Sequence, residues 1–212
     1  VEKVARGFFD DVNPETAQKI QKKINGMSWK CKLLNLPCFV PDQKVLAIVD
    51  AQKDFIDGSM GVGMEKWKKA KAAIIDLMKK EKYDSIVYTK DWHPTNHCSF
   101  KDQGGPWPSH CVAGAKGAEI DAELLAVNIP SVTLNKGCNP NVEEYGIDVL
   151  PNVDNVKELH LVGLCFDYCV QSCAKETAKT HPNTKIVVKK AGTVAIDENA
   201  KIDWEGLNVK VE

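Results

Sequence analysis

The stretch Lys44-Val-Leu-Ala-Ile-Val-Asp50 is a nearly continuous run of apolar residues that ends in a carboxylate. Runs of this kind are typical of strands that are buried on both faces of a parallel sheet. Further strands are predicted at 85–90, 131–134, 159–164 and 184–188, and helices between them at 64–80, 117–126 and 168–180. This alternation predicts an α/β fold, an open and mostly parallel sheet with helices on both faces.

Composition limits what the chain can do. It has 212 residues, a formal net charge of -1 and 43% hydrophobic residues, as expected for a globular protein that does not bind nucleic acid. No apolar run approaches the roughly 20 residues that a membrane-spanning helix needs. We predict one domain at 41–212, preceded by an N-terminal extension at 1–40 in which a helix begins near Asn13-Pro14. Assembly into a homo-oligomer is left open.

The eight cysteines indicate reduced thiols rather than a disulfide framework. Cys165, Cys169 and Cys173 follow one another at four-residue intervals, which places them on one face of a helix. The N-terminal residues do not resemble a secretory signal, because the segment is short and mixed and contains Asp10-Asp11. We therefore expect a cytoplasmic protein, in which free thiols can serve as nucleophiles or metal ligands.

The polar residues that could carry chemistry follow the predicted strands. Ligands of parallel sheets collect at the carboxyl ends of the strands, which share one rim. The residues that come at or just after the four strand ends are Asp50, then Asp91 and His93, then Lys136, and last Cys165 and Cys169. Chance would scatter such residues over both rims, so we expect one functional site.

Cys169 is the candidate nucleophile. It lies in Gly163-Leu-Cys-Phe-Asp-Tyr-Cys-Val170, a strand-to-helix turn in which Asp167 is predicted to be the helix N-cap. Backbone N–H groups in a first helical turn favour a thiolate and can bind an oxyanion. The alternative is a small buried core thiol, and the alternatives for Asp50 and Lys136 are a turn residue and a solvated surface lysine.

A second cluster suggests a metal site. Three of the five histidines fall between residues 93 and 110, and Asp91 and His93 are two apart, so their side chains point the same way at a strand end. With a third donor from a nearby loop they can make a three-ligand site with open positions, which favours catalysis. The alternatives are histidines that only hydrogen-bond loops, or a closed structural zinc site that uses Cys98 and Cys111.

Taken together, these motifs resemble the nicotinamidase branch of the isochorismatase-like cysteine hydrolase superfamily. The resemblance covers roughly residues 44 to 197, and the metal motif is what indicates the nicotinamidase branch. The matching motifs are Asp50-Ala-Gln-Lys-Asp-Phe55, Asp91-Trp-His-Pro-x-x-His97-x-Ser-Phe100, Trp107-Pro-x-His-Cys111, Lys136-Gly137 and Gly163-x-x-x-Asp167-x-Cys-Val170. The last of these selects Cys169 rather than Cys165 as the nucleophile.

The resemblance implies a three-layer sandwich and a role for each catalytic residue. Cys169 would be the nucleophile, Asp50 the general base and Lys136 their electrostatic partner. The backbone N–H groups of Cys165 and Cys169 would form the oxyanion hole, next to a cis peptide bond between Leu164 and Cys165.

The resemblance also implies a metal and a substrate pocket. Asp91, His93 and His110 would bind one divalent metal ion, commonly zinc, and His97 is expected behind them in the second coordination shell. Phe55 and Trp107 would sandwich a pyridine ring, and Leu164 and Cys165 would also contact the substrate.

The predicted function is hydrolysis of nicotinamide to nicotinate and ammonia through a thioester on Cys169, as a step of NAD salvage. The metal would anchor the ring nitrogen and so hold the amide over the sulfur, which is catalysis by positioning. Two alternatives remain. A metal-independent relative would hydrolyse another small amide or an enol ether and should lack the Asp-Trp-His set, and a non-catalytic binding module should have lost Asp50, Lys136 or Cys169.

Overall fold

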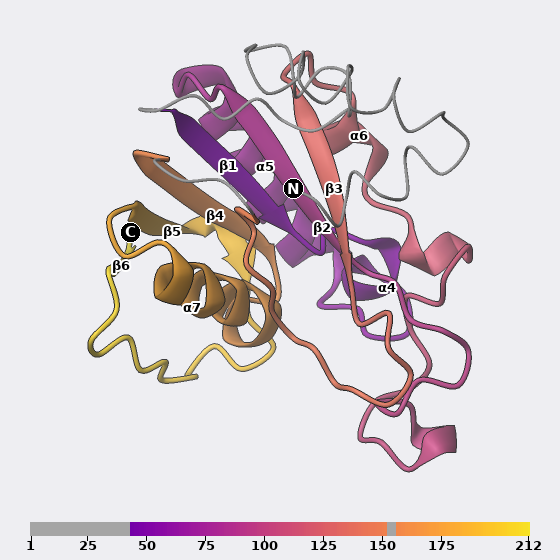
Figure 1. The fold of residues 1–212 in the computed structure, drawn as a ribbon. Helices are drawn as coiled ribbons and strands as arrows, with labels where there is room; N and C mark the ends of the chain where they lie inside the picture. Colours follow the sequence, from indigo (N-terminus) through magenta and orange to yellow (C-terminus); the bar gives the residue numbers. More distant parts are fainter. Residues whose placement is uncertain (1–42, 152–155) are drawn as a thin grey trace, which may run out of the picture. The chain divides into compact units, whose positions relative to one another are not determined.

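The computed structural model, which describes residues 43–151 and 156–212, contains one six-stranded sheet (Figure 1). The predicted extension at 1–40 and its helix lie outside the described residues. All strand pairs are parallel, and their order across the sheet is β3-β2-β1-β4-β5-β6. The strands are β1 (Lys44–Val49), β2 (Ser85–Asp91), β3 (Ser131–Lys136), β4 (Glu158–Leu164), β5 (Lys185–Val194) and β6 (Val209–Val211). The predicted α/β fold is confirmed.

Helices cover both faces of the sheet. The side chains of the central strand β1 point alternately to the two faces, so they pack into two hydrophobic cores. Leu46 and Ile48 of β1 pack on the same side as Trp67 of helix α5 (Met64–Lys80). Val45 packs on the other side with Ala174 of helix α7 (Gln171–Thr180). All of these side chains are buried, so β1 is apolar along its whole length, as expected for a strand covered on both faces.

Short helices and turns connect the strands. They are α4 (Lys53–Ile56), α6 (Ala122–Leu125), two 3₁₀ turns at Lys101–Gln103 and Lys116–Ala118, and a π-helical turn at Phe166–Val170. The strand order reverses direction between β1 and β4. A crevice opens at this kind of switch point in parallel sheets, at the carboxyl ends of the strands, and ligands bind there.

Two details of the predicted secondary structure are wrong. The helix predicted at 117–126 is broken into a 3₁₀ turn and α6, because the side chain of Asp121 accepts a hydrogen bond from the Glu123 amide and so begins a new helix. Gly117 also passes so close to Asp54 that a Cβ atom there would lie 2.0 Å from the Asp54 carboxylate. In addition, α4 and β6 were not predicted, since both are too short to show a periodic pattern.

No helix in the described part of the chain is long and apolar enough to cross a membrane.

Candidate active site

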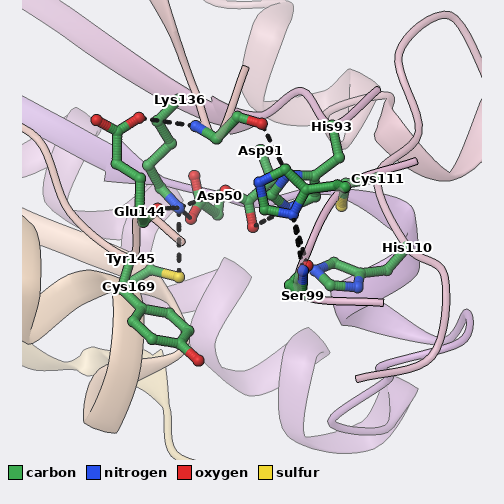
Figure 2. Close-up of polar contacts among 12 residues, drawn as sticks. Asp50, Asp91, His93, Ser99, His110, Cys111, Lys136, Glu144, Tyr145 and Cys169 are labelled. Carbon is green, nitrogen blue, oxygen red and sulfur yellow. Dashed lines mark hydrogen bonds and ion pairs between the residues drawn. The ribbon is translucent and has the colours of Figure 1, made fainter. Parts of the chain in front are cut away.

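The ends of β1, β3 and β4 bring Asp50, Lys136 and Cys169 together (Figure 2). The Lys136 ammonium nitrogen lies 2.9 Å from Asp50 Oδ2 and 3.5 Å from Cys169 Sγ. The sequence placed Lys136 in a turn, whereas the structure makes it the last residue of β3, where its side chain is 0% exposed. A buried cation between a carboxylate and a thiol can stabilise negative charge on either one.

Asp50 is held in one orientation by the neighbouring strand. Thr89 of β2 donates a hydrogen bond from its hydroxyl to Asp50 Oδ1 at 2.7 Å, and the Asp50 amide bonds to the Thr89 backbone oxygen at 3.2 Å. The backbone of Asp50 has φ 45°, a left-handed conformation that residues other than glycine rarely adopt. Complete burial raises the pKa of the Asp50 carboxyl, and the charge of Lys136 opposes that rise. A carboxylate with a raised pKa is a better proton acceptor.

Asp91 shares the same cation. Lys136 also donates to Asp91 Oδ1, so one ammonium group bridges two buried carboxylates. Burial raises the pKa of Asp91, but the charges and hydrogen bonds of Lys136 and His93 together outweigh this effect and lower the pKa to about 2. Both neighbouring carboxylates in turn hold the pKa of Lys136 well above its ordinary value, against the opposite effect of burial. These shifts favour a negative charge on Asp91 and a positive charge on Lys136 at neutral pH.

Cys169 lies in the π-helical turn and is 5% exposed. Burial raises the pKa of its thiol well above the ordinary value, and Lys136 opposes the rise. A thiol in this setting needs a base to remove its proton. The candidate base is the Asp50 carboxylate, since one oxygen each of Asp50 and Asp91 and the Cys169 sulfur all lie within 4.8 Å of one another. The peptide bond between Leu164 and Cys165 is cis, as the family resemblance implied.

The predicted helix cap is wrong. Neither the π-helical turn nor α7 has a side-chain N-cap. Asp167 instead accepts hydrogen bonds from two backbone amides of a distant loop, Ile196 at 2.9 Å and Asp197 at 2.8 Å. The helix continues from the preceding turn without a break, so no cap is needed at this residue.

Asp91, His93 and His110 can hold a metal ion, because donor atoms of all three lie within 4.8 Å of one another. His93 Nδ1 lies 2.9 Å from the carbonyl of Gly137 and His110 Nδ1 lies 2.8 Å from that of Pro108. A carbonyl only accepts, so in both neutral rings Nδ1 donates and Nε2 keeps its lone pair. His93 Nε2 is buried and has no hydrogen-bond partner, which is the state of a nitrogen prepared for a metal.

Gly137 allows the His93 ring to sit where it does. Its φ is 63°, and a Cβ atom at this position would lie 2.4 Å from Cε1 of the imidazole. The Gly137 amide donates to the Glu144 carboxylate at 2.8 Å, which fixes the turn (Figure 2). Only a residue without a side chain satisfies both the backbone conformation and the close approach.

His97 packs against this centre from behind. Its ring centroid lies 4.1 Å from that of His93, and its two nitrogens are occupied by the Ser99 hydroxyl at 2.7 Å and the Val142 carbonyl at 3.1 Å. The donor groups found among the described residues include neither Cys98 nor Cys111, so the alternative of a closed structural zinc site has no support. The second group found, Asp50, Asp91 and Cys169, surrounds the Lys136 ammonium.

A narrow pocket of about 30 Å³ opens between the thiol and the candidate metal ligands. Phe55 and Trp107 both line it, as predicted for the walls of a ring site, and Cys165 also lines it, whereas Leu164 is fully buried and does not. The remaining lining residues are Met60, Asp91, His110, Glu143, Tyr145, Tyr168, Cys169 and Ile196. A lining that combines four aromatic side chains with two carboxylates suits a small, flat, polar ligand.

Sequence reasoning missed three residues that organise the site. Gln52 is fully buried; its amide nitrogen donates to the Asp91 carbonyl at 2.8 Å and its oxygen accepts from the Asp91 amide at 2.8 Å, which ties the end of β1 to the end of β2. Tyr145 accepts from the Trp107 indole at 2.9 Å. The Glu144 carboxylate accepts a hydrogen bond from the Gly137 amide. A glutamine directly after an apolar strand was a usable signal, but Glu144 and Tyr145 lie in a loop whose path no local pattern reveals.

Comparison with known proteins identifies the family of the chain. A model of the isochorismatase domain family matches residues 44–200. The chain is 30% identical to a nicotinamidase/pyrazinamidase of Mycobacterium tuberculosis over 166 residues, which cover 73% of this chain and 89% of the relative. Among solved structures, it resembles a pyrazinamidase of Pyrococcus horikoshii in complex with zinc, at 29% identity and a TM-score of 0.59, covering 74% and 88% of the two chains. It also resembles PnC1 from L. infantum in complex with nicotinate, at 29% identity and a TM-score of 0.66, covering 75% and 86%.

The fold and these matches define a hydrolase of the isochorismatase-like class, and the chain belongs to the isochorismatase domain family. The resemblance to its nicotinamidase branch, first indicated by the sequence motifs, is confirmed by the curated relatives.

Proposed function

We propose that the chain hydrolyses nicotinamide to nicotinate and ammonia. The observation that carries the proposal is the position of Asp91. One of its oxygens accepts from Lys136, the partner of Asp50 and Cys169, while the other lies 3.5 Å from the free Nε2 of His93. A nucleophilic group and a metal-binding group are thus joined through one carboxylate, with an aromatic pocket between them. An aromatic carboxamide that carries a ring nitrogen matches both groups at once.

The protein groups supply a complete amide hydrolysis. Asp50 takes the proton of the Cys169 thiol, and the sulfur attacks the amide carbonyl carbon. Asp50 then gives that proton to the leaving nitrogen, the C–N bond breaks, and ammonia departs from a thioester. A water molecule that loses its proton to Asp50 attacks the thioester carbonyl, the C–S bond breaks, and nicotinate leaves while the thiol regains a proton.

Electrostatic stabilisation comes from two sources. The Lys136 ammonium, 3.5 Å from Cys169 Sγ, favours the thiolate as it forms. The backbone N–H groups of Cys165 and Cys169 are proposed to bind the carbonyl oxygen when it becomes an oxyanion, since both belong to the turn that carries the sulfur. Removal of one such donor typically costs about 10² to 10³ in rate.

The residues present fit a divalent metal. A buried Asp-His-His set with both imidazoles oriented by carbonyls is a three-ligand arrangement with open positions, and zinc, which a similar pyrazinamidase structure contains, is the proposed ion. When bound, such an ion supplies a Lewis-acid anchor for a ring nitrogen. His97, packed on His93, is proposed to support that ligand from the second coordination shell rather than to bind the ion.

The proposed reaction belongs to NAD salvage, because its product, nicotinate, is a precursor of pyridine nucleotides. A similar structure contains nicotinate and another, a yeast nicotinamidase, contains the inhibitor nicotinaldehyde. A small-molecule substrate and a cytoplasmic location are both part of the proposal.

The test is ammonia release from nicotinamide by the purified full chain, with and without a chelator, and with Cys169→Ala as the matched blank. Release that requires Cys169 and falls after chelation supports the proposal. Undiminished release from Cys169→Ala would reject the nucleophile, and no release by the native chain loaded with zinc would reject the substrate.

A further inference from the structure

The pocket has two exposed lining residues, Glu143 and Ile196, and Ile196 lies in the loop that follows β5. Its volume of about 30 Å³ makes it a narrow space, so the position of each lining side chain affects which ligands fit. Phe55 and Cys169 are buried, but Ile196 is 48% exposed although it lines the same pocket. A half-exposed side chain on a loop has few packing contacts of its own, so its position depends on how the loop is tethered.

Asp167 tethers this loop. Both of its carboxylate oxygens are used, one for the Ile196 amide at 2.9 Å and the other for the Asp197 amide at 2.8 Å. Asp167 is 7% exposed, so these charge-assisted hydrogen bonds are shielded from water and are strong. A second tether of the loop, the ion pair of Glu198 with Lys66, is exposed at 71% and 52% and contributes little.

Asp167 also belongs to the turn that carries the nucleophile, two residues before Cys169. The loop is therefore attached to the same rigid turn as the sulfur. The two amide bonds to Asp167 therefore fix the backbone of Ile196 relative to the turn that carries Cys169.

We propose that Asp167 is a positioning residue that holds Ile196 as the outer wall of the pocket, and that this pair limits the site to small, unsubstituted aromatic amides. The inference rests on the proposed function for the identity of the substrate, but the opening above Cys169 can be measured without any turnover. The proposal therefore expects the Ile196 side chain to exclude a ring-methylated amide more strongly than an unsubstituted one.

The experiment compares two thiol reagents of different size. The full chain is treated with iodoacetamide or with N-phenylmaleimide, and modification of Cys169 is followed by peptide mass spectrometry. Ile196→Ala and Asp167→Ala should each raise the rate for the bulky reagent relative to the small one by about tenfold, the scale at which missing methylene groups change discrimination. Asp167→Asn, which keeps one accepting oxygen, should fall between Asp167→Ala and the native chain.

A double variant shows whether Asp167 acts through Ile196. If it does, the double variant Asp167→Asn, Ile196→Ala should show the same ratio of the two labelling rates as Ile196→Ala alone. The reason is that the effects of coupled residues do not add. Additive effects would overturn the proposal. Glu198→Gln is the matched control on the same loop, and it should leave the ratio unchanged.

Turnover gives a second readout. The ratio of kcat/KM for nicotinamide to that for a ring-methylated nicotinamide should fall by about tenfold in Ile196→Ala.

Should Asp167→Ala fail to fold, Ile196→Ala still decides the question, because Ile196 is half-exposed and its replacement should not disturb the core. A native chain that releases no ammonia from nicotinamide would reject the proposed substrate alone. A labelling ratio that no variant changes, including a Cys169 that neither reagent modifies, would reject the role of Asp167 and Ile196.

Discussion

The ammonium group of Lys136 lies 2.9 Å from a carboxylate oxygen of Asp50, and both side chains are 0% exposed. Lys136→Met would leave this carboxylate buried without its cation. Breaking a buried pair by removing one partner typically costs about 3 to 5 kcal/mol, so we expect a loss of that size in the free energy of unfolding, measured by urea denaturation. The matched control is Lys80→Met, which removes an exposed pair with Asp76 and should cost less than about 1 kcal/mol. Equal losses in the two variants would contradict a buried charge pair.

The nucleophile can be assigned by comparing three cysteines of the same segment. Cys169→Ala should abolish turnover, while Cys165→Ala and Cys173→Ala should keep it, since Cys169 is the cysteine whose sulfur lies 3.5 Å from Lys136 Nζ. Cys173 is fully buried, which makes its variant a control for repacking of the same helix. Ammonia release is the measurement, and an active Cys169→Ala or an inactive Cys165→Ala would point to a different nucleophile.

Metal content tests the ligand set directly. We expect one divalent ion per chain in elemental analysis, and His110→Ala should lower the occupancy because it removes one of three ligands. His181→Ala is the control, since that histidine pairs with Asp148 and has no place among the three ligands. Full occupancy in His110→Ala would exclude His110 as a ligand.

Benzamide has the ring and the amide of nicotinamide but no ring nitrogen. Its kcat/KM should be lower, because an interaction that positions the reacting group is lost. Pyrazinamide keeps the nitrogen and should be hydrolysed, whereas a riboside substituted on that nitrogen should be excluded. Similar kcat/KM values for nicotinamide and benzamide would remove the reason to place the ring nitrogen next to Asp91, His93 and His110.

The opposite end of the sheet predicts an acid-sensitive contribution to stability. A hydrogen bond from Lys185 and one from His160 lower the pKa of Glu158 to about 2. A carboxyl group whose pKa is depressed by folding stabilises the fold above its unfolded pKa of about 4.3 and loses that contribution as the pH falls towards 2. Because Glu158 is partly exposed, the effect should be about 1 kcal/mol. The free energy of unfolding of Glu158→Gln should fall less than that of the native chain between pH 5 and 2, and Glu123→Gln serves as the surface control.

The sequence was sufficient where one local pattern determines the structure. The apolar run ending at Asp50 predicted β1 and its position in the middle of a sheet, and the helical spacing around Trp67 predicted α5 with its bounds. The rim at which Asp50, Asp91 and Lys136 meet followed from the rule that parallel strands end on the same side.

What could not be predicted depends on contacts between distant residues. Asp167 looked like a helix cap because an acidic residue before a helix commonly is one, but its partners lie 29 and 30 residues further along the chain. The close approach of Gly117 to Asp54, more than 60 residues earlier, is likewise a contact between distant parts of the chain. Neither contact leaves a trace in the local pattern.

The close contact between Gly137 and the His93 ring has a consequence for sorting the relatives of this protein. A homologue could retain every predicted ligand and the cysteine and still carry alanine at this position, where the new methyl carbon would fall 2.4 Å from an imidazole carbon. Its ring would have to turn away, and a survey that counts ligands alone would misclassify it as intact. The absence of a side chain at position 137 should be scored together with the three ligands when members of the family are assigned to metal-dependent or metal-free groups.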